Sequence, residues 1–283
     1  MSGTDFGPRT IRPSSLTVFA DCARRWAARH LTAELESAGY KLNGDSQTHV
    51  GAAIGSGVHA AAHYTLEEKR LTGGLGADSE AEDRAIAEFD ERSQFGIGWD
   101  DTTDSVSVAK KQIARMARSY RRHVAPRIEP ELIEERLEVD IGDGWGMSGQ
   151  LDTLAGDPFN NLRDLKTGSR QRSNGVQYGA YTMLFRAHGY SVHRITEDFI
   201  PRVRLAHEQP LPRETDIPIG AAVADAWELL DDIKRSTATF EARLGDPSGR
   251  APHTAFRANP SSSLCGPRWC RAFGTEFCSA HRR

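Results

Sequence analysis

Apolar and polar positions follow two different periods along the chain. In residues 105–124 (SVSVAKKQIARMARSYRRHV), apolar side chains recur at helical spacing, and lysines and arginines fill the remaining positions. The segment that begins at Pro13 has helical spacing too, after a Ser-Ser pair suited to a helix start. Residues 132–141, 146–156 and 161–168 have the alternation or the length that is typical of strands. The pattern therefore predicts helices first and strands after them.

The remaining segments complete this order. Further helices are predicted over residues 55–71, 81–93, 175–189 and 216–243, a fourth strand over 192–203, and loops over 40–57 and 72–80. Helices are followed by three strands, a helix, a strand and more helices. This order predicts an α/β core with a helical N-terminal addition.

The same pattern divides the chain into an arm, one domain and a tail. Residues 1–12 are predicted to form a flexible arm, and 13–245 a single domain. Within it, 13–125 form the helical part and 126–245 the α/β core. The tail, 246–283, is rich in Pro, Ser and Gly and contains three of the four cysteines.

Composition narrows the classes of function. The chain has 283 residues, of which 38% are hydrophobic, enough for one or two domains. The net charge of −3 is no general signature of nucleic-acid binding, so any surface for a polyanion must be local. No apolar run is long enough for a membrane span, and the first residues lack the apolar core of a signal peptide. We expect a soluble cytoplasmic protein.

Two acids and a lysine surround a predicted hairpin in residues 149–168 (GQLDTLAGDPFNNLRDLKTG). On a strand, Asp164 and Lys166 point to one side and Leu165 to the other, into the core. Asp152 reaches the same edge if the two strands pair. Such carboxylates suit Mg²⁺ or Mn²⁺, and the lysine could orient or deprotonate a water. The alternative is an exposed hairpin with a surface Lys–Asp pair.

These residues belong to a longer series of motifs. The series comprises G-x-x-D at Gly149–Asp152, D-x-K-T-G at Asp164–Gly168, Q-x-x-x-Y at Gln177–Tyr181, and GSGVH ending at His59. In this order they resemble the PD-(D/E)XK nuclease superfamily, and within it the RecB-like branch. The resemblance covers about residues 50–200. It implies a restriction-endonuclease-like core, a central mixed sheet flanked by helices.

The resemblance also implies roles for these residues. Asp152, Asp164 and Lys166 would be catalytic, together with an earlier acid for which Glu134 fits better than Glu135. The metal would be held by His59, Asp152, Asp164 and the carbonyl of Leu165. Gln177 and Tyr181 share a helix face that would border the site and contact DNA.

His59 also has a simpler interpretation, because a histidine in an Ala-rich helix is often a packed residue. The downstream motifs favour the ligand role for His59. The neighbouring His63 is interpreted as a packed or capping residue.

The cysteines are Cys22 and, in the tail, Cys265, Cys270 and Cys278. In a cytosolic chain a metal site is favoured over disulfides. A tetrahedral thiolate site would close the tail onto Cys22. The layout resembles the iron–sulfur subgroup of RecB-like nucleases, which includes AddB, the CRISPR-adaptation nuclease and phage exonucleases. This resemblance implies a structural 4Fe–4S cluster. Structural zinc and four free buried cysteines are the alternatives.

Several basic residues are candidates for DNA contacts. Arg170 and Arg172 follow the strand with Lys166, and Arg24 and Arg25 lie next to Cys22. The basic helix 105–124 could follow phosphates or simply be a solvated face. Trp145 could stack on bases, although core packing is the preferred interpretation.

Together these features predict an Mg²⁺- or Mn²⁺-dependent DNA exonuclease that hydrolyses phosphodiester bonds in phage or mobile-element recombination or repair. The expected partner is single-stranded DNA or the ends of duplex DNA, and a recombination or helicase protein is compatible with this role. The alternatives are an endonuclease or CRISPR-spacer processing nuclease, and a catalytically silent DNA-binding or assembly module.

Overall fold

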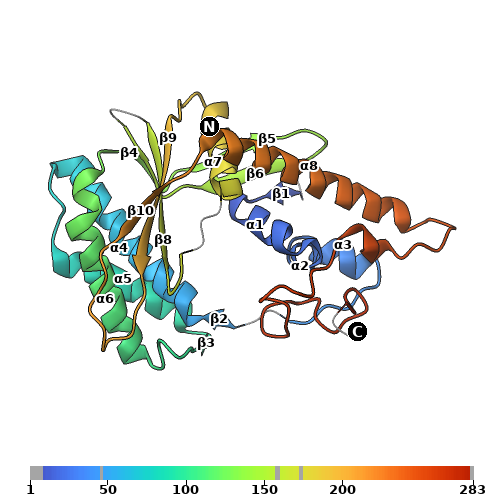
Figure 1. Cartoon of the computed structure of the whole chain (residues 1–283), viewed down its shortest axis with the longest axis horizontal. Coiled ribbons are helices and arrows are strands. Elements are labelled where there is room, and N and C mark those ends of the chain that lie inside the picture. The colour runs from blue at the N-terminus through green and yellow to red at the C-terminus, as the bar shows by residue number, and fades with distance from the viewer. Residues whose placement is uncertain (1–8, 45–46, 157–159, 172–174, 281–283) are drawn as a thin grey trace.

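The protein is described here from a computed structural model, in which residues 9–44, 47–156, 160–171 and 175–280 are described. Figure 1 shows a sheet with helices on both sides and an irregular tail beside the first helices. The α/β class predicted from the sequence is confirmed.

The main sheet has five strands in the order β10-β9-β8-β7-β4. Their bounds are β4 Pro130–Ile133, β7 Thr153–Ala155, β8 Asn161–Gly168, β9 Arg194–Pro201 and β10 Arg213–Asp216. β8 and β9 run parallel, with Asp164 opposite Glu197, and the other neighbours are antiparallel. The sheet is therefore mixed, as the resemblance implies. β10 is a short polar strand that the sequence pattern did not indicate.

A second sheet contains parts of the predicted strands 132–141 and 146–156 that do not belong to the main sheet. It contains β1 Thr10–Ile11, β5 Arg136–Asp140 and β6 Gly146–Gln150, in the order β1-β6-β5. The predicted strands 132–141 and 146–156 are thus each broken in two. The break falls at Glu134, whose φ of 48° is left-handed, and its N–H bonds the carbonyl of Asp152 at 3.0 Å. Both acids therefore lie at the corner between the sheets.

The predicted flexible arm is only partly described, and the described part belongs to the fold. Ile11 in β1 is 1% exposed, and it lies opposite Met147 of the parallel strand β6 (Gly146–Gln150). Arg9 forms an ion pair with Glu241. Burial of Ile11 and the strand pairing fix residues 9–12, so the prediction of flexibility was wrong for them. Residues 1–8 lie outside the described residues.

One face of the main sheet is covered by α4 Val50–Thr72, α5 Asp78–Ser93 and α6 Val106–His123. Their apolar residues form a core with Leu165 and Ile200 of the sheet. α4 begins at Val50, inside the predicted loop 40–57. The glycines that suggested a loop serve packing instead, since a Cβ at Gly57 would lie 2.6 Å from the Ala85 carbonyl oxygen.

The other face is covered by α7 Gly175–Ala187 and α8 Ile219–Arg243, with α1 Pro13–Asp21, α2 Ala23–His30 and α3 Thr32–Ser37 beyond them. Their core includes Leu154, Leu162 and Ile195 of the sheet. The first predicted helix is broken at Cys22, which is extended. Short elements complete the fold: β2 Thr48–His49, β3 Ile97–Gly98, and the 3₁₀ turns η1 Ala125–Arg127 and η2 Pro252–Ala255.

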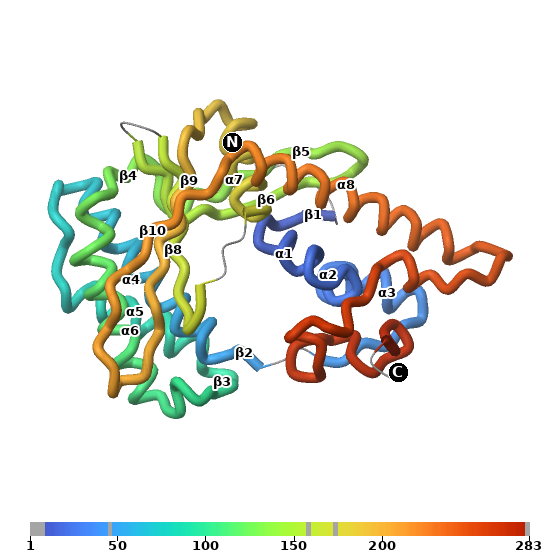
Figure 2. Tube along the Cα trace, in the orientation of Figure 1, coloured from blue at the N-terminus to red at the C-terminus, as the bar shows by residue number. Residues whose placement is uncertain are grey.

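The tail after α8 folds back onto the first helices, as the trace in Figure 2 shows. The N–H of Arg24 bonds the carbonyl of Arg257 at 3.2 Å, and the N–H of Asn43 bonds that of Arg271 at 2.9 Å. The two ends of the described chain therefore form one lobe. Among the described helices, none has the length and apolar character needed to cross a membrane.

Gly179 permits the closest approach of α7 to α8. A Cβ there would lie 1.9 Å from the carbonyl oxygen of Ala222. Because two backbones would have to separate, Gly179→Ala should destabilise the protein by about 3 kcal/mol or more. Chemical denaturation of both variants measures this. Gly220→Ala in α8, which would meet nothing within 4 Å, is the control; equal stability of the two variants would contradict the packing argument.

Candidate functional site

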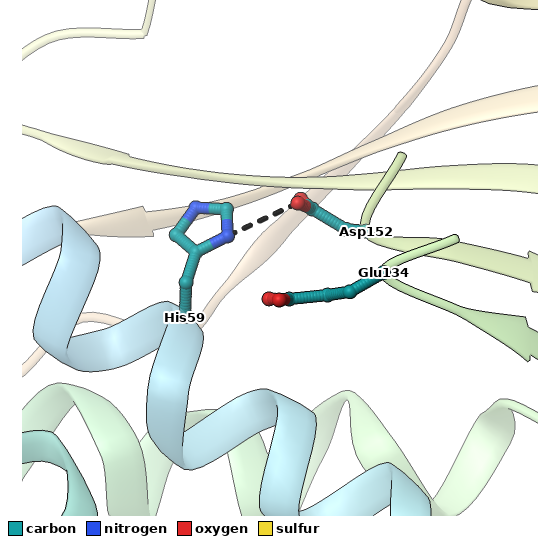
Figure 3. A group of neighbouring side chains, drawn as sticks. All are labelled: His59, Glu134 and Asp152. Carbon is teal, nitrogen blue, oxygen red and sulfur yellow. Dashed lines mark ion pairs between the residues drawn. The ribbon is translucent and has the colours of Figure 1, made fainter. Parts of the chain in front are cut away.

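Three side chains that could bind a metal meet at the corner between the sheets. His59 projects from α4, and Glu134 and Asp152 face it from the two broken strands (Figure 3). Each offers a ligand atom, and these atoms lie within 4.8 Å of one another. His59 Nδ1 is 3.1 Å from Asp152 Oδ1. All three residues are half-buried.

The two acids are held in place by neighbours. The other oxygen of Asp152 accepts the N–H of Leu165 at 2.7 Å. Glu134 Oε2 accepts the amide of Gln150 at 3.2 Å and lies 3.3 Å from Nδ1 of His63. His63, interpreted as a packed residue, is therefore a direct neighbour of the site. These contacts orient both carboxylates toward His59.

Asp164 and Lys166 lie beside this group on β8. Lys166 Nζ is 2.6 Å from Asp164 Oδ2, and the Asp164 side chain is buried. The Tyr178 hydroxyl from α7 lies 3.3 Å from the same oxygen and 2.5 Å from Glu197 Oε2. Asp164 is thus bound by a cation and a hydroxyl, and it is not one of the three residues whose ligand atoms cluster.

The charges in the site depend on one another. Burial disfavours the charge on His59, but the adjacent Asp152 outweighs it and raises the pKa of His59. Burial also works against ionised Asp152, and here His59 and Lys166 prevail and lower its pKa. For Asp164, burial dominates over the charge of Lys166 and raises its pKa to about 6. The pKa of Lys166 is raised, because Asp164 and Asp152 outweigh its burial. Lys166 is therefore an ammonium in this arrangement.

The donor atoms fit a divalent cation. Carboxylate oxygens are the usual ligands of Mg²⁺ and Mn²⁺, and one imidazole is compatible with Mn²⁺. His59, Glu134 and Asp152 would supply one nitrogen and two carboxylates from three separate segments. Asp164 and the Leu165 carbonyl, predicted as further ligands, lie on the adjoining strand. The structure thus groups Glu134 with the candidate ligands His59 and Asp152, whereas the sequence analysis gave it a catalytic role alone.

The predicted DNA-contacting residues differ in exposure. Gln177 and Tyr181 are each 6% exposed, and the Tyr181 hydroxyl donates to the carbonyl of Gln150 at 3.0 Å. A Cβ at Gly149 would lie 2.8 Å from the Tyr181 ring, so the glycine of G-x-x-D allows this packing. Tyr181 thus packs against the end of β6, which leads to Asp152. Arg170 is exposed, and Arg172 lies outside the described residues.

Several of the other basic candidates are bound by groups of the protein itself. On α6, Lys110, Arg118 and Arg121 pair with acids of α5. Arg24 is buried and donates to the carbonyls of Phe256 and His253. The prediction of a DNA-contacting surface at Arg24 and Arg25 was wrong, because both side chains are about nine-tenths buried. Trp145 is buried too, in agreement with core packing.

The four cysteines line one small cavity between α1–α2 and the tail, together with apolar residues such as Leu264 and Phe273. Burial raises the pKa of the Cys265 and Cys270 thiols, and the neighbouring cysteines add to this. The Asn259 N–H lies 3.4 Å from Cys22 Sγ. The fold therefore brings four cysteines from both ends of the described chain to the walls of one cavity.

Arg25 provides an independent observation at this cavity. It lines the cavity, is 9% exposed, and uses Nη2 for an ion pair with Asp21 at 2.9 Å. Its Nη1 is buried without a hydrogen-bond partner among the described residues. A buried donor without a hydrogen-bond partner costs free energy. A sulfur atom bound to a metal carries negative charge and would accept a hydrogen bond from Nη1. The residues present therefore fit a metal–thiolate centre.

Two contributors to the site had no signal in the sequence. Tyr178 lies inside the Q-x-x-x-Y motif but is not part of it, and Glu197 sits in a strand that reads as ordinary. Both are fully buried around Asp164. The register of β8 with β9 brings Glu197 beside Asp164, and only a correct strand pairing could have revealed this.

Known proteins resemble this chain in sequence pattern and in fold. The family model of the PD-(D/E)XK nuclease superfamily matches residues 10–272. Among solved structures, a candidate exonuclease from Eubacterium rectale superposes with a TM-score of 0.53 at 11% identity, covering 94% of this chain and 92% of its own. A second structure, SSO0001, has a TM-score of 0.28 at 11% identity, covering 71% and 83%. No curated protein matches the sequence significantly.

Proposed function

The chain belongs to the PD-(D/E)XK nuclease superfamily, and from this premise we propose that it is an Mg²⁺- or Mn²⁺-dependent DNA exonuclease. The observation that carries the proposal is the convergence of His59, Glu134 and Asp152 beside the Asp164–Lys166 pair. A silent binding module would have no use for buried, mutually oriented charges, which are costly to maintain.

The reaction is hydrolysis of a phosphodiester bond. The oxygen of a water attacks phosphorus and that water loses a proton, the bond to the leaving sugar oxygen breaks, and the leaving oxygen takes up a proton. The ammonium of Lys166 can hold the attacking water and the negative charge that develops on the phosphate. Asp164 orients this ammonium, since its Oδ2 lies 2.6 Å from Lys166 Nζ. The Tyr178 hydroxyl donates a hydrogen bond to the same oxygen and orients Asp164 in turn.

His59, Glu134 and Asp152 would hold the divalent ion, with Asp164 and the Leu165 carbonyl as further ligands. When bound, the ion supplies Lewis-acid stabilisation of the phosphate oxygens. The protein contributes the orientation of these ligands through the Leu165 N–H and the Gln150 amide.

The proposal is tested with end-labelled linear DNA and a closed circle of the same sequence, in Mn²⁺. An exonuclease releases short products from the linear substrates and leaves the circle intact. Cleavage of the circle would instead favour an endonuclease or a CRISPR-spacer processing nuclease. Binding without cleavage of either substrate would indicate a DNA-binding or assembly module.

His59→Ala should weaken metal use while leaving the fold in place. His59 supplies one ligand and holds Asp152, so we expect the Mn²⁺ concentration for half-maximal activity to rise about 10- to 100-fold. A metal titration of the initial rate measures this shift. His207→Ala, at an exposed histidine outside the site, should titrate like the wild type. An unchanged midpoint for His59→Ala would remove His59 from the ligand set.

For the second centre, we propose that Cys22, Cys265, Cys270 and Cys278 bind a 4Fe–4S cluster that fastens the tail to the first helices. The convergence of four thiols and the unpaired Arg25 donor support a metal–thiolate centre. The choice of iron–sulfur over zinc and a role in phage or mobile-element recombination or repair rest on the resemblance of the motifs.

A further inference from the structure

A basic groove runs along α1 and α2 on the side that faces the main sheet. It consists of two adjoining hollows of about 430 and 750 Å³, which share Val18 and Arg29. Figures 1 and 2 show α1 and α2 across from β2, with the tail closing the lower end. The groove is lined by Arg12, Arg29, Arg136 and Arg271. Arg25 also borders it, but its side chain is largely buried and paired with Asp21.

Acidic residues are nearly absent from this groove. Among the described residues that line it, Glu138 is the single carboxylate, and it accepts a hydrogen bond from Ser148 at 2.9 Å. The chain as a whole carries more acidic than basic residues, with a net charge of −3. The groove is therefore the local basic surface that a protein of this charge would need for a polyanion.

Two of the arginines are free to bind a ligand. Arg12 and Arg29 are exposed, and in the described part of the chain neither is paired with a carboxylate. The exposed Arg84 and Arg92 on α5, by contrast, pair with Glu80 and Glu88. Unpaired arginines in an acid-free groove are available for phosphate, whereas those of α5 are already neutralised.

His30 also lines the groove, and the positive charges of Arg29 and Arg12 act on it. Burial, together with the charges of Arg29 and Arg12, lowers the pKa of His30 to about 4. The positive potential thus comes from fixed arginine charges and does not depend on His30.

The groove is connected to the candidate catalytic site at both ends. Arg136 donates to Gln150 at 3.1 Å, and Gln150 donates to Glu134 at 3.2 Å. At the other end, His49 lines the groove and caps α4, the helix that carries His59. Ten helical residues span about 15 Å, so a strand bound in the groove lies within a few nucleotides of the site.

We propose that this groove binds the phosphodiester backbone of the strand that reaches the catalytic site, outside the reacting nucleotide. This proposal rests on the proposed nuclease function. Arg12 and Arg29 contact successive phosphates, and Arg136 links the groove to the corner that holds Glu134.

The test compares Arg12→Gln/Arg29→Gln with the control Arg84→Gln/Arg92→Gln, after checking that both melt like the wild type. Binding of labelled single-stranded and blunt duplex oligonucleotides is measured in EDTA over a range of salt. Loss of two phosphate contacts should lower the slope of log K against log salt by about 1.4 for a single strand, or about 1.8 for duplex. The Kd at low salt should rise about tenfold, and the control should match the wild type. The substrate form whose slope changes identifies the strand that the groove holds.

A short chromogenic phosphodiester, such as a nucleoside 4-nitrophenyl phosphate, separates the groove from the site. The groove variant should hydrolyse it normally, while its KM for polymeric DNA rises about tenfold with kcat unchanged. Unchanged salt slopes for both DNA forms, or equal loss on the short substrate, would overturn the groove proposal. A wild type that neither binds nor cleaves DNA would instead refute the nuclease function itself.

Discussion

Lys166→Ala is expected to reduce metal-dependent DNA cleavage by about 10²- to 10⁴-fold. Lys166 carries the ammonium closest to the candidate ligands, and its Nζ lies 2.6 Å from Asp164. Alanine cannot hold a water or stabilise the charge that develops on the phosphate. Initial rates on end-labelled DNA at saturating Mn²⁺ measure the loss, and DNA binding in EDTA should persist.

Two further variants separate the role of this charge from its effect on folding. Lys166→Arg keeps a cation, so partial activity would indicate that charge matters more than proton transfer. Lys110→Ala removes a lysine that pairs with Asp90 on α5 and not with a residue of the site. It should cleave like the wild type. Because Lys166→Ala leaves a buried carboxylate without its cation, its melting temperature is compared as well. Cleavage at the wild-type rate by a folded Lys166→Ala variant would contradict the mechanism.

The sequence could predict the central hairpin of the site because its chemistry is local. Strand alternation places Asp164 and Lys166 on one side, and the pairing of β7 with β8 brings Asp152 close. The corner was not predictable, because it depends on left-handed backbone at Glu134, a non-glycine residue. Without that bend the strand would continue straight, and the Glu134 side chain would not be directed toward His59. The weakest residue assignment from the sequence is therefore the one that the fold explains best.

Charge patterns were less informative than charge neighbours. The α6 helix reads as a basic surface, but α5 lies beside it and supplies acids to Lys110, Arg118 and Arg121. Arg24 and Arg25 look exposed in sequence, yet the tail covers them. In both cases the partner comes from another element, and helical periodicity carries no information about it. The unpaired Arg12, which precedes α1, and Arg29 of α2 are recognised only by the absence of such partners in the described structure.

The cysteine centre should have the largest effect on stability. The tail is held to the first helices by a few backbone hydrogen bonds, such as Arg24 to Arg257 and Asn43 to Arg271. Four sulfur–metal bonds between Cys22 and the tail would exceed these contacts by far, since binding of a structural metal contributes directly to folding free energy. Cys22→Ser should therefore lose the metal and release the tail, with a melting temperature lower by about 10 °C or more.

Metal analysis, visible absorption and limited proteolysis of anaerobically purified protein test this prediction together. The wild type should contain iron and acid-labile sulfide, absorb visible light, and resist cleavage in 246–280; Cys22→Ser should lose all three properties. Ser263→Ala, an exposed change in the same tail, should keep them.

Arg25→Met, which removes the buried donor, should keep four thiolates but lose the metal to a chelator about tenfold faster or more, since hydrogen bonds to charged groups contribute about 1.5–3 kcal/mol. A colourless wild type that contains zinc would show that the centre binds zinc and no iron–sulfur cluster. The proposal that the centre fastens the tail would still hold. Four free thiols in a stable wild type would refute both.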